Sequence, residues 1–506
     1  MKRFQLITVL LSCMAGAALA EDGAAERFIE YKSSPPLLRA FLYRMPKGGD
    51  LHSHLSGAAY AEANIRAGAD ANLCVDPTTT QVSKRPCIKP ILPLADALTD
   101  INLRKTIVNA WSMLDFVPGD GNSGHDHFFG TFSLFGGAAQ AGDMAAEVVD
   151  RAGRQRMRYV ELMVTFQGQA INTVADNAQK AKPWTGDPAA FEATLTRLGL
   201  MDLVPKAKAD LDGVEQRMRT VLGCGTVAAR PGCGVTVRWL HQVSRTAPRH
   251  RVFTSALLGA LLNRADPRAV GLNFVQPEDH PAALADYTVQ MQLLDYINGR
   301  VPEANITLHA GELTLGLVPP EHLLFHIRLA VELGHAKRIG HGVDVMYEDD
   351  PFDLLRTMAA RRVAVEINLT SNAQILGVEG AAHPFQTYRA AGVPVLLCTD
   401  DEGIARIDRT HELQRAVTTY DLDWPSLVAL ERNTLEYAFV AGGSLWADAR
   451  AWRMVADCAD ASPSNEPPSD CAAYLAANEK ARLQWTFERD LLAFDEEARG
   501  PRLRLR

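Results

Sequence analysis

Short runs of apolar and β-branched residues recur along the chain, and longer stretches compatible with helix separate them. A buried run of four to eight residues followed by a helical stretch is typical of a parallel βα unit. Eight such units predict an α/β protein whose strands close into a (β/α)8 TIM barrel, rather than an open sheet. The runs cover residues 48–54, 158–165, 235–243, 270–276, 306–310, 338–341, 363–369 and 394–399.

The spacing of the runs is uneven, and the longest gap separates the first run from the second. Within this gap, residues from about 66 to 95 contain Cys74 and Cys87 and are rich in Pro and Thr, which predicts an inserted excursion after strand 1. After the last run the chain continues in helical patterns, and we expect extra C-terminal helices from about 424 to 506. We expect a single domain over residues 21–506.

The first 20 residues have the pattern of a cleaved secretory signal. Lys2 and Arg3 precede an apolar run, and small residues lead up to Ala20. We therefore expect a secreted or periplasmic protein. The alternative is a lipid anchor on Cys13, which would truncate the apolar region. No later uncharged run reaches the ~20 residues that a membrane span needs, so no transmembrane segment is expected.

Composition narrows the class of protein further. The chain is 47% hydrophobic and 22% charged, which is typical of a folded globular protein. Its 52 Lys and Arg against 60 Asp and Glu give a formal net charge of -8, and the basic residues are scattered apart from a short C-terminal cluster. This balance argues against binding to a nucleic-acid backbone.

Six of the eight cysteines form three pairs that are close in sequence. Each pair flanks a stretch rich in Pro, Gly, Thr or Ser, which predicts three local disulfides in an oxidising compartment. Free thiols or a metal site are the alternative, although the C-x-x-C spacing of a zinc knuckle is absent. Cys398 lies in an apolar run and is expected as a buried thiol. The pairs are Cys74 with Cys87, Cys224 with Cys233, and Cys458 with Cys471.

Histidines and carboxylates gather where the predicted strands end. In a barrel the carboxyl ends of the strands meet at one face, so these residues would form a single site. Residues two apart on a strand project to the same side, so the first two histidines can reach one ion. The residues are His52, His54, His309, Glu312, His341, Asp400 and Asp401.

Two histidines from one strand, a third histidine and one aspartate make a ligand shell that suits Zn²⁺. A metal-bound water has a pKa near 7, and a second carboxylate can carry its proton to a leaving group. The pattern therefore predicts metal-assisted hydrolysis. Near residue 125, histidines precede several phenylalanines, which indicates a substrate-covering helix or, alternatively, a second metal site.

The series HxH, HAGE, GHG, SN and TDD closely resembles the adenosine deaminase family of the amidohydrolase superfamily. The signal and the cysteine-bearing insertion make the chain look most like the secreted adenosine deaminase-related growth factor branch or a bacterial counterpart. The resemblance implies one zinc ion per chain and three further roles: Glu312 gives a proton to purine N1, His341 orients the attacking hydroxide, and Asp401 hydrogen-bonds the purine. The implied metal ligands are His52, His54, His309 and Asp400.

Two positions depart from the family pattern. Ser56 stands where the adenosine enzymes typically place Asp to bind the ribose, and Gln276 stands where the family usually has Gly. With Asp401, these are the expected substrate-binding residues. The resemblance implies deamination of adenosine or 2′-deoxyadenosine to the inosine product and ammonia, and the departures keep open another 6-aminopurine, such as adenine, an N6-substituted adenosine or an AMP-type nucleotide.

Two further alternatives stay open. A purine-binding or signalling protein could use the same fold, although the set of seven site residues argues for an enzyme. The growth-factor-like branch often dimerises, which makes a homodimer an alternative to a monomer. The stretch from Thr370 to Asn372, followed by His383, is shared by several relatives and is either a structural loop or part of the site.

Overall fold

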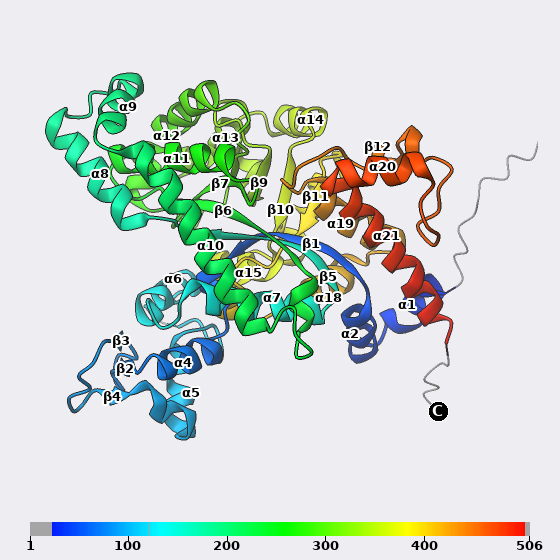
Figure 1. Ribbon diagram of the computed structural model, residues 1–506, viewed down its shortest axis with the longest axis horizontal. Helices are drawn as coiled ribbons and strands as arrows, with labels where there is room; N and C mark the ends of the chain where they lie inside the picture. Colours follow the sequence, from blue (N-terminus) through cyan, green and yellow to red (C-terminus); the bar gives the residue numbers. More distant parts are fainter. Residues whose placement is uncertain (1–22, 120, 501–506) are drawn as a thin grey trace, which may run out of the picture.

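A computed structural model describes residues 23–119 and 121–500 of the chain, so the predicted signal at residues 1–20 lies outside the described residues. Eight parallel strands form two four-stranded sheets, in the orders β1-β5-β6-β7 and β11-β10-β9-β8 (Figure 1). The strands are β1 (Lys47–His54), β5 (Met157–Val164), β6 (Thr236–Ser244), β7 (Ala269–Val275), β8 (Thr307–Ala310), β9 (Arg338–His341), β10 (Ala364–Ile367) and β11 (Val395–Leu397).

Single parallel bridges join the two sheets at both edges. Ser53 pairs with Asp400 between β1 and the end of β11, and Leu272 pairs with Ile306 between β7 and β8. The predicted (β/α)8 barrel is therefore confirmed, and each predicted run overlaps one strand. The seventh strand is shorter than expected because Leu369 already begins helix α15 (Leu369–Leu376).

Helices cover the outside of the barrel, and α7 (Ala141–Arg154) shows why the sequence forms them. Its buried positions Ala145, Val148, Val149 and Ala152 repeat at helical spacing and face the strands. The other helices that follow barrel strands are α8 (Gly168–Ala181), α9 (Pro188–Arg197), α10 (Leu203–Leu222), α11 (Arg249–Ala265), α12 (Pro281–Arg300), α13 (His326–Glu332), α14 (Pro351–Arg361), α16 (Phe385–Ala390), α17 (Glu402–Ala405), α18 (Arg409–Tyr420) and α19 (Trp424–Glu436).

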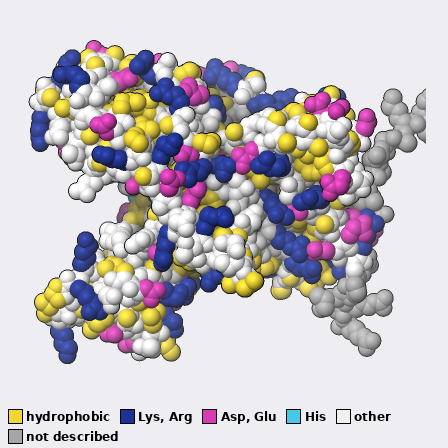
Figure 2. Space-filling model, viewed as in Figure 1, with side chains coloured by type: hydrophobic (Ala, Val, Ile, Leu, Met, Phe, Trp, Pro, Cys, Tyr) yellow, Lys and Arg dark blue, Asp and Glu magenta, His cyan; other side chains and the backbone are white. Residues whose placement is uncertain are grey.

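The excursion after β1 forms a lobe that stands apart from the barrel (Figures 1 and 2). A three-stranded sheet of order β3-β2-β4 lies in it, and the Cys74–Cys87 disulfide crosses this part of the lobe. The chain then returns through α6 to α7 (Ala141–Arg154). The elements of the excursion are α3 (Leu55–Ala58), α4 (Ala61–Asp70), β2 (Cys74–Val75), β3 (Val82–Ser83), β4 (Leu92–Pro93), α5 (Ile101–Ala110) and α6 (Gly124–Phe135).

The C-terminal part packs onto the barrel beside the N-terminal helices (Figure 1). Helix α19 lies against β1 and β11, and α21 contacts both α19 and α1. The backbone N–H of Ala24 donates to Asp495 at 2.8 Å, which ties the two ends of the described chain together. The remaining elements are α1 (Ala24–Lys32), α2 (Pro35–Arg44), β12 (Trp446–Asp448), β13 (Arg453–Met454), α20 (Ser469–Ala477) and α21 (Glu479–Ala498).

All three predicted cysteine pairs are disulfide-bonded, and Cys398 is a buried free thiol. Basic and acidic side chains are interspersed over the face seen in Figure 2. Among the described residues, no helix combines the length and the apolar character that crossing a membrane requires.

The Cys458–Cys471 disulfide joins two cysteines that lie 13 residues apart in sequence. Both are buried in a small core with Trp446 and Trp485. Replacing both cysteines with serine should lower the free energy of unfolding by about 3 kcal/mol, because a cross-link of this loop length restricts the unfolded chain by roughly that amount. Urea unfolding measures the change. An unaltered midpoint would show that the loop is held by its other contacts.

Candidate metal centre and active site

The ends of four strands carry the four predicted metal ligands and His341, the residue predicted to orient the nucleophile, to one point inside the barrel mouth. His52 and His54 close β1, His309 lies in β8, His341 ends β9, and Asp400 follows β11. All five side chains are buried. This is the carboxyl end of the strands, where barrel enzymes place their chemistry.

The ligand atoms of the four predicted metal ligands converge. His309 Nε2 lies 3.0 Å from His52 Nε2 and 3.1 Å from His54 Nε2, and Asp400 Oδ1 lies 3.5 and 3.3 Å from the same two nitrogens. Ligands about 2.0–2.1 Å from a tetrahedral ion lie about 3.3 Å from one another. These residues therefore fit a metal ion of that size.

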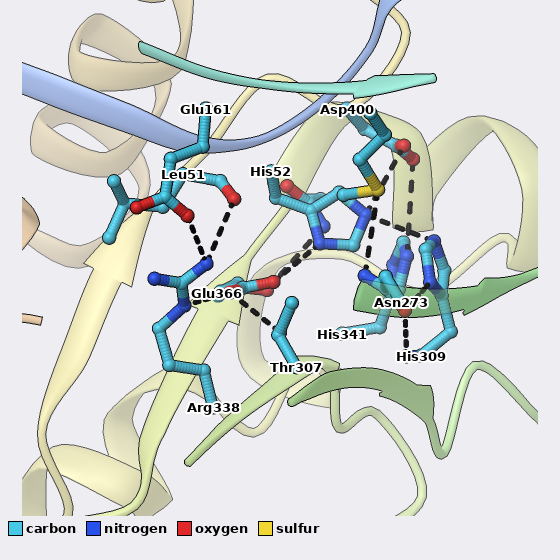
Figure 3. A network of polar contacts seen from close by, with 12 residues as sticks. Leu51, His52, Glu161, Asn273, Thr307, His309, Arg338, His341, Glu366 and Asp400 are labelled. Carbon is cyan, nitrogen blue, oxygen red and sulfur yellow. Dashed lines mark hydrogen bonds and ion pairs between the residues drawn. The ribbon is translucent and has the colours of Figure 1, made fainter. Parts of the chain in front are cut away.

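Each of the three histidines has a partner on its other ring nitrogen. Glu366 lies 2.6 Å from His52 Nδ1, and the Asn273 side-chain oxygen lies 2.9 Å from His309 Nδ1 (Figure 3). Gln242 Nε2 lies 2.7 Å from His54 Nδ1. The oxygen partners of His52 and His309 hold a proton at Nδ1 and leave Nε2 free to bind a metal, and partners of this kind fix the orientation of the ring.

A chain of buried charges continues from His52 into the barrel (Figure 3). Glu366 accepts from the hydroxyl of Thr307 at 2.9 Å and from Nε of Arg338 at 2.5 Å. Arg338 also donates to Glu161 at 2.6 Å. Sequence reasoning missed these residues, although an ionisable side chain inside an apolar strand run is a signal that could have found them.

His341 lies beside the predicted ligands, and its backbone has a φ of 70°, in the left-handed region. Its Nε2 is buried without a hydrogen-bond partner among the described residues and lies 4.0 Å from Asp400 Oδ2. Burial, with repulsion from His52 and His54, lowers the pKa of His341 to about 3. The imidazole is therefore neutral at pH 7, and Nε2 faces the site.

Glu312 follows His309 by three residues and points into the same space. Burial, together with the charges of Asp400 and Glu278, raises the pKa of its carboxyl well above the usual value. Glu278 accepts the backbone N–H groups of Gly311 and Glu312 at 3.2 and 3.0 Å, so it holds the turn. The raised pKa favours the protonated form of this positioned carboxyl, which is the form that can donate a proton.

Asp401 is buried next to Asp400. Burial and the charge of Asp400 raise the pKa of Asp401 well above the usual value, and its Oδ1 has no hydrogen-bond partner among the described residues. A Cβ at Gly57 would lie 1.7 Å from this oxygen, so only glycine fits there. Gly57, three residues after β1, thus leaves the space that the Asp401 carboxylate occupies.

A cavity of about 240 Å³ opens beside these groups. Three phenylalanines of α6, Phe128, Phe129 and Phe132, form one wall, as expected for a covering helix. Ser56 and Gln276 line the same cavity, and no Lys or Arg is among the described residues around it. A larger hollow lies between α4 and α7, but none of the predicted site residues and no other group of possible metal ligands among the described residues lines it. The smaller cavity is therefore the candidate active site.

Gln276 has a φ of 85°, a conformation that favours glycine. Its side chain is exposed at the cavity. An L-residue in this conformation carries backbone strain, and such strain gathers at functional sites.

The comparison with known protein families matches the adenosine deaminase family over residues 126–444, more than half of the chain. The chain belongs to this family. The matched range contains His309, Glu312, His341 and both aspartates, and it begins after the strand that carries His52 and His54.

Curated relatives match over shorter ranges. The adenosine deaminase of Shewanella loihica is 37% identical over 137 residues, which cover 27% of this chain and 38% of that protein. The adenosine deaminase of Clostridium perfringens is 27% identical over 168 residues, 33% of this chain and 43% of that protein. The match therefore spans about two fifths of the length of these relatives.

Solved structures share the fold. Arabidopsis ADAL, solved in complex with IMP, superposes with a TM-score of 0.51 at 18% identity and covers 90% of this chain and 99% of its own. The Arabidopsis N6-mAMP deaminase MAPDA gives a TM-score of 0.50 at 20% identity, covering 79% of this chain and 95% of its own.

Replacing Glu366 with glutamine should weaken metal binding by roughly 10- to 100-fold, because the variant loses the charge that orients His52. Competition with a metal chelator measures the affinity. Glu431→Gln is the matched control, since Glu431 is equally buried and pairs with Arg409 at 2.5 Å without touching a predicted ligand. Equal metal affinity in Glu366→Gln and the wild type would show that Glu366 does not contribute to metal binding.

Proposed function

We propose that the protein is a zinc-dependent hydrolytic deaminase of adenosine and 2′-deoxyadenosine, which releases ammonia and the inosine product. The observation that carries the proposal is that four side chains able to bind a metal converge beside the buried carboxyl of Glu312, whose pKa is raised, at a cavity of about 240 Å³. Family membership agrees with this reaction.

His52, His54, His309 and Asp400 would hold one zinc ion per chain. Zinc bound there would supply Lewis acidity and make water nucleophilic at neutral pH. The nitrogen-rich shell with one carboxylate suits zinc better than the oxygen shells of magnesium or calcium.

The remaining groups take the roles that their positions suit. Water adds its oxygen to purine C6, and Glu312 gives its proton to N1. One proton of that water restores Glu312, and the other passes from the new C6 hydroxyl to the amino nitrogen. The C6–N bond then breaks, so that ammonia leaves and the C6 oxygen becomes a carbonyl. The net reaction consumes one water and releases one ammonia. His341, neutral and facing the site, would orient the nucleophile, and Asp401 would hydrogen-bond the purine.

The cavity lining favours a nucleoside over a nucleotide. A phosphate is usually met by Arg or Lys, and neither is among the described lining residues. The neutral hydroxyl of Ser56 can hydrogen-bond a sugar, while the phenylalanines of α6 offer a surface for the flat purine ring. Ser56 and Gln276 favour, as the second candidate, another 6-aminopurine such as adenine or an N6-substituted adenosine.

We also propose that the protein acts outside the cytoplasm, in the periplasm or after secretion. Three disulfides are typical of an oxidising compartment. Residues 1–20 would be the cleaved signal.

The test of the reaction is ammonia or amine release by the mature protein from adenosine, 2′-deoxyadenosine, adenine, AMP and N6-methyladenosine, with zinc measured on the same sample. We expect rapid turnover of the two nucleosides and about one zinc per chain. Adenosine as the poorest substrate would support the second candidate, and zinc without turnover of any of them would contradict both. Neither zinc nor turnover would favour a purine-binding protein.

Replacing Glu312 with glutamine should lower kcat by about 10²- to 10⁴-fold, because the amide has no proton to give to the ring. Steady-state deamination of adenosine measures the loss. Glu348→Gln is the matched control: Glu348 is buried, burial raises its pKa to about 7, and it binds the backbone of α13 away from the cavity. Near-normal turnover by Glu312→Gln would refute the acid role.

A further inference from the structure

A line of buried polar groups leads from the start of α16 to His341. The backbone N–H of Phe385 donates to His383 Nδ1 at 3.1 Å. His383 Nε2 lies 3.0 Å from Asn372 Oδ1, and Asn372 Nδ2 lies 2.9 Å from His341 Nδ1. The three side chains are almost fully buried, and none of them lines the cavity.

The direction of every hydrogen bond in this line follows from its first member. A backbone N–H can only donate, so His383 Nδ1 must be an acceptor without a proton. The proton of neutral His383 is then on Nε2, which donates to Asn372 and fixes the carbonyl oxygen on that side. The Asn372 amide therefore turns its NH₂ group toward His341 Nδ1, which accepts. His341 must carry its own proton on Nε2.

Electrostatics agree with neutral rings in this line. Burial lowers the pKa of His383 to about 4, and Arg415 adds repulsion. Protonated His383 would also turn an N–H group against the N–H of Phe385. Glu312 Oε1 also lies near His341 Nδ1, at 3.4 Å, but it is farther away than the Asn372 amide at 2.9 Å.

We propose that His383 and Asn372 are positioning residues that fix His341 in the tautomer with the proton on Nε2, the nitrogen that faces the predicted metal ligands. The catalytic consequence rests on the proposed function: an N–H at Nε2 can donate to the nucleophilic oxygen and hold its lone pair toward the purine. The opposite tautomer would present only a lone pair at Nε2, which can accept a hydrogen bond but cannot donate one to that oxygen.

The tautomer itself is the first measurement, and it requires no substrate. In the zinc-loaded protein with ¹⁵N-labelled histidine, the nitrogen shifts of His341, assigned by the loss of its signals in His341→Gln, should show Nε2 protonated and Nδ1 bare. A proton on Nδ1 would overturn the proposal. A proton on Nε2 in a protein that deaminates no purine would support the proposed tautomer and contradict only the proposed function.

Asn372→Asp should reverse the hydrogen bond between residue 372 and His341, because a carboxylate of the same shape can only accept a hydrogen bond. We expect the His341 proton to move to Nδ1 and kcat to fall by about 10²- to 10⁴-fold with KM and zinc content within a few-fold, as for other histidines held in the wrong tautomer. The matched control is Gln374→Glu, two residues along α15, whose amide bonds Ala405 instead of His341. An unmoved proton, or an equal loss in the control, would contradict the proposal.

His383 offers a conservative pair of variants. In His383→Gln the side-chain amide reaches about as far as imidazole Nε2 and still donates to Asn372, so kcat should stay within a few-fold of the wild type. His383→Leu removes the donor, frees the Asn372 amide to turn over, and should lower kcat at least tenfold. Equal kcat in the two variants would mean that His383 only fills space.

Discussion

The backbone seam between the first and last barrel strands is the constraint on which the site depends. Asp400 donates its N–H to the carbonyl of His52 at 2.9 Å, and the N–H of His54 donates to the carbonyl of Asp400 at 3.2 Å. Asp50 reinforces the seam by binding Thr399 and the backbone of His52. Three of the four residues that would bind metal, His52, His54 and Asp400, are thus also residues that close the barrel at this edge, so closing the barrel brings these three ligands together.

The interior below this seam is charged, and its charges are arranged to suit a cation. Glu161 and Glu366 share the guanidinium of Arg338, which leaves one negative charge in excess beside His52. Buried ions are costly unless they are paired and hydrogen-bonded. A positive ion among the histidines would balance this excess negative charge. Glu366 therefore favours metal binding through its charge as well as by orienting His52.

The strands and the seven site residues were predictable because their signals are local: apolar runs mark the strands, and histidines or carboxylates stand at their ends. Glu366 and Arg338 are ionisable residues inside strand runs, and His383 follows a stretch that the sequence already singled out, but none of these local signals reveals which residue each of them binds. Their partners lie far away in sequence and become neighbours only when the barrel closes. The covering helix α6 was suggested by its phenylalanines, yet its place over the cavity depends on the path of the whole excursion. Gln276 marked a departure in sequence, and its left-handed backbone became visible only in the fold.

The disulfides have a consequence for biosynthesis. Six cysteines can pair in 15 ways, yet here each cysteine bonds to the one nearest to it in sequence, 9 or 13 residues away. Short loops close fastest, so random oxidation of the emerging chain already favours the native pairs. Cys398, the remaining thiol among the described residues, is buried in the barrel wall of the folded protein. It is therefore shielded from thiol–disulfide exchange with the three disulfides. The cysteine pattern therefore reduces the need for an isomerase during maturation.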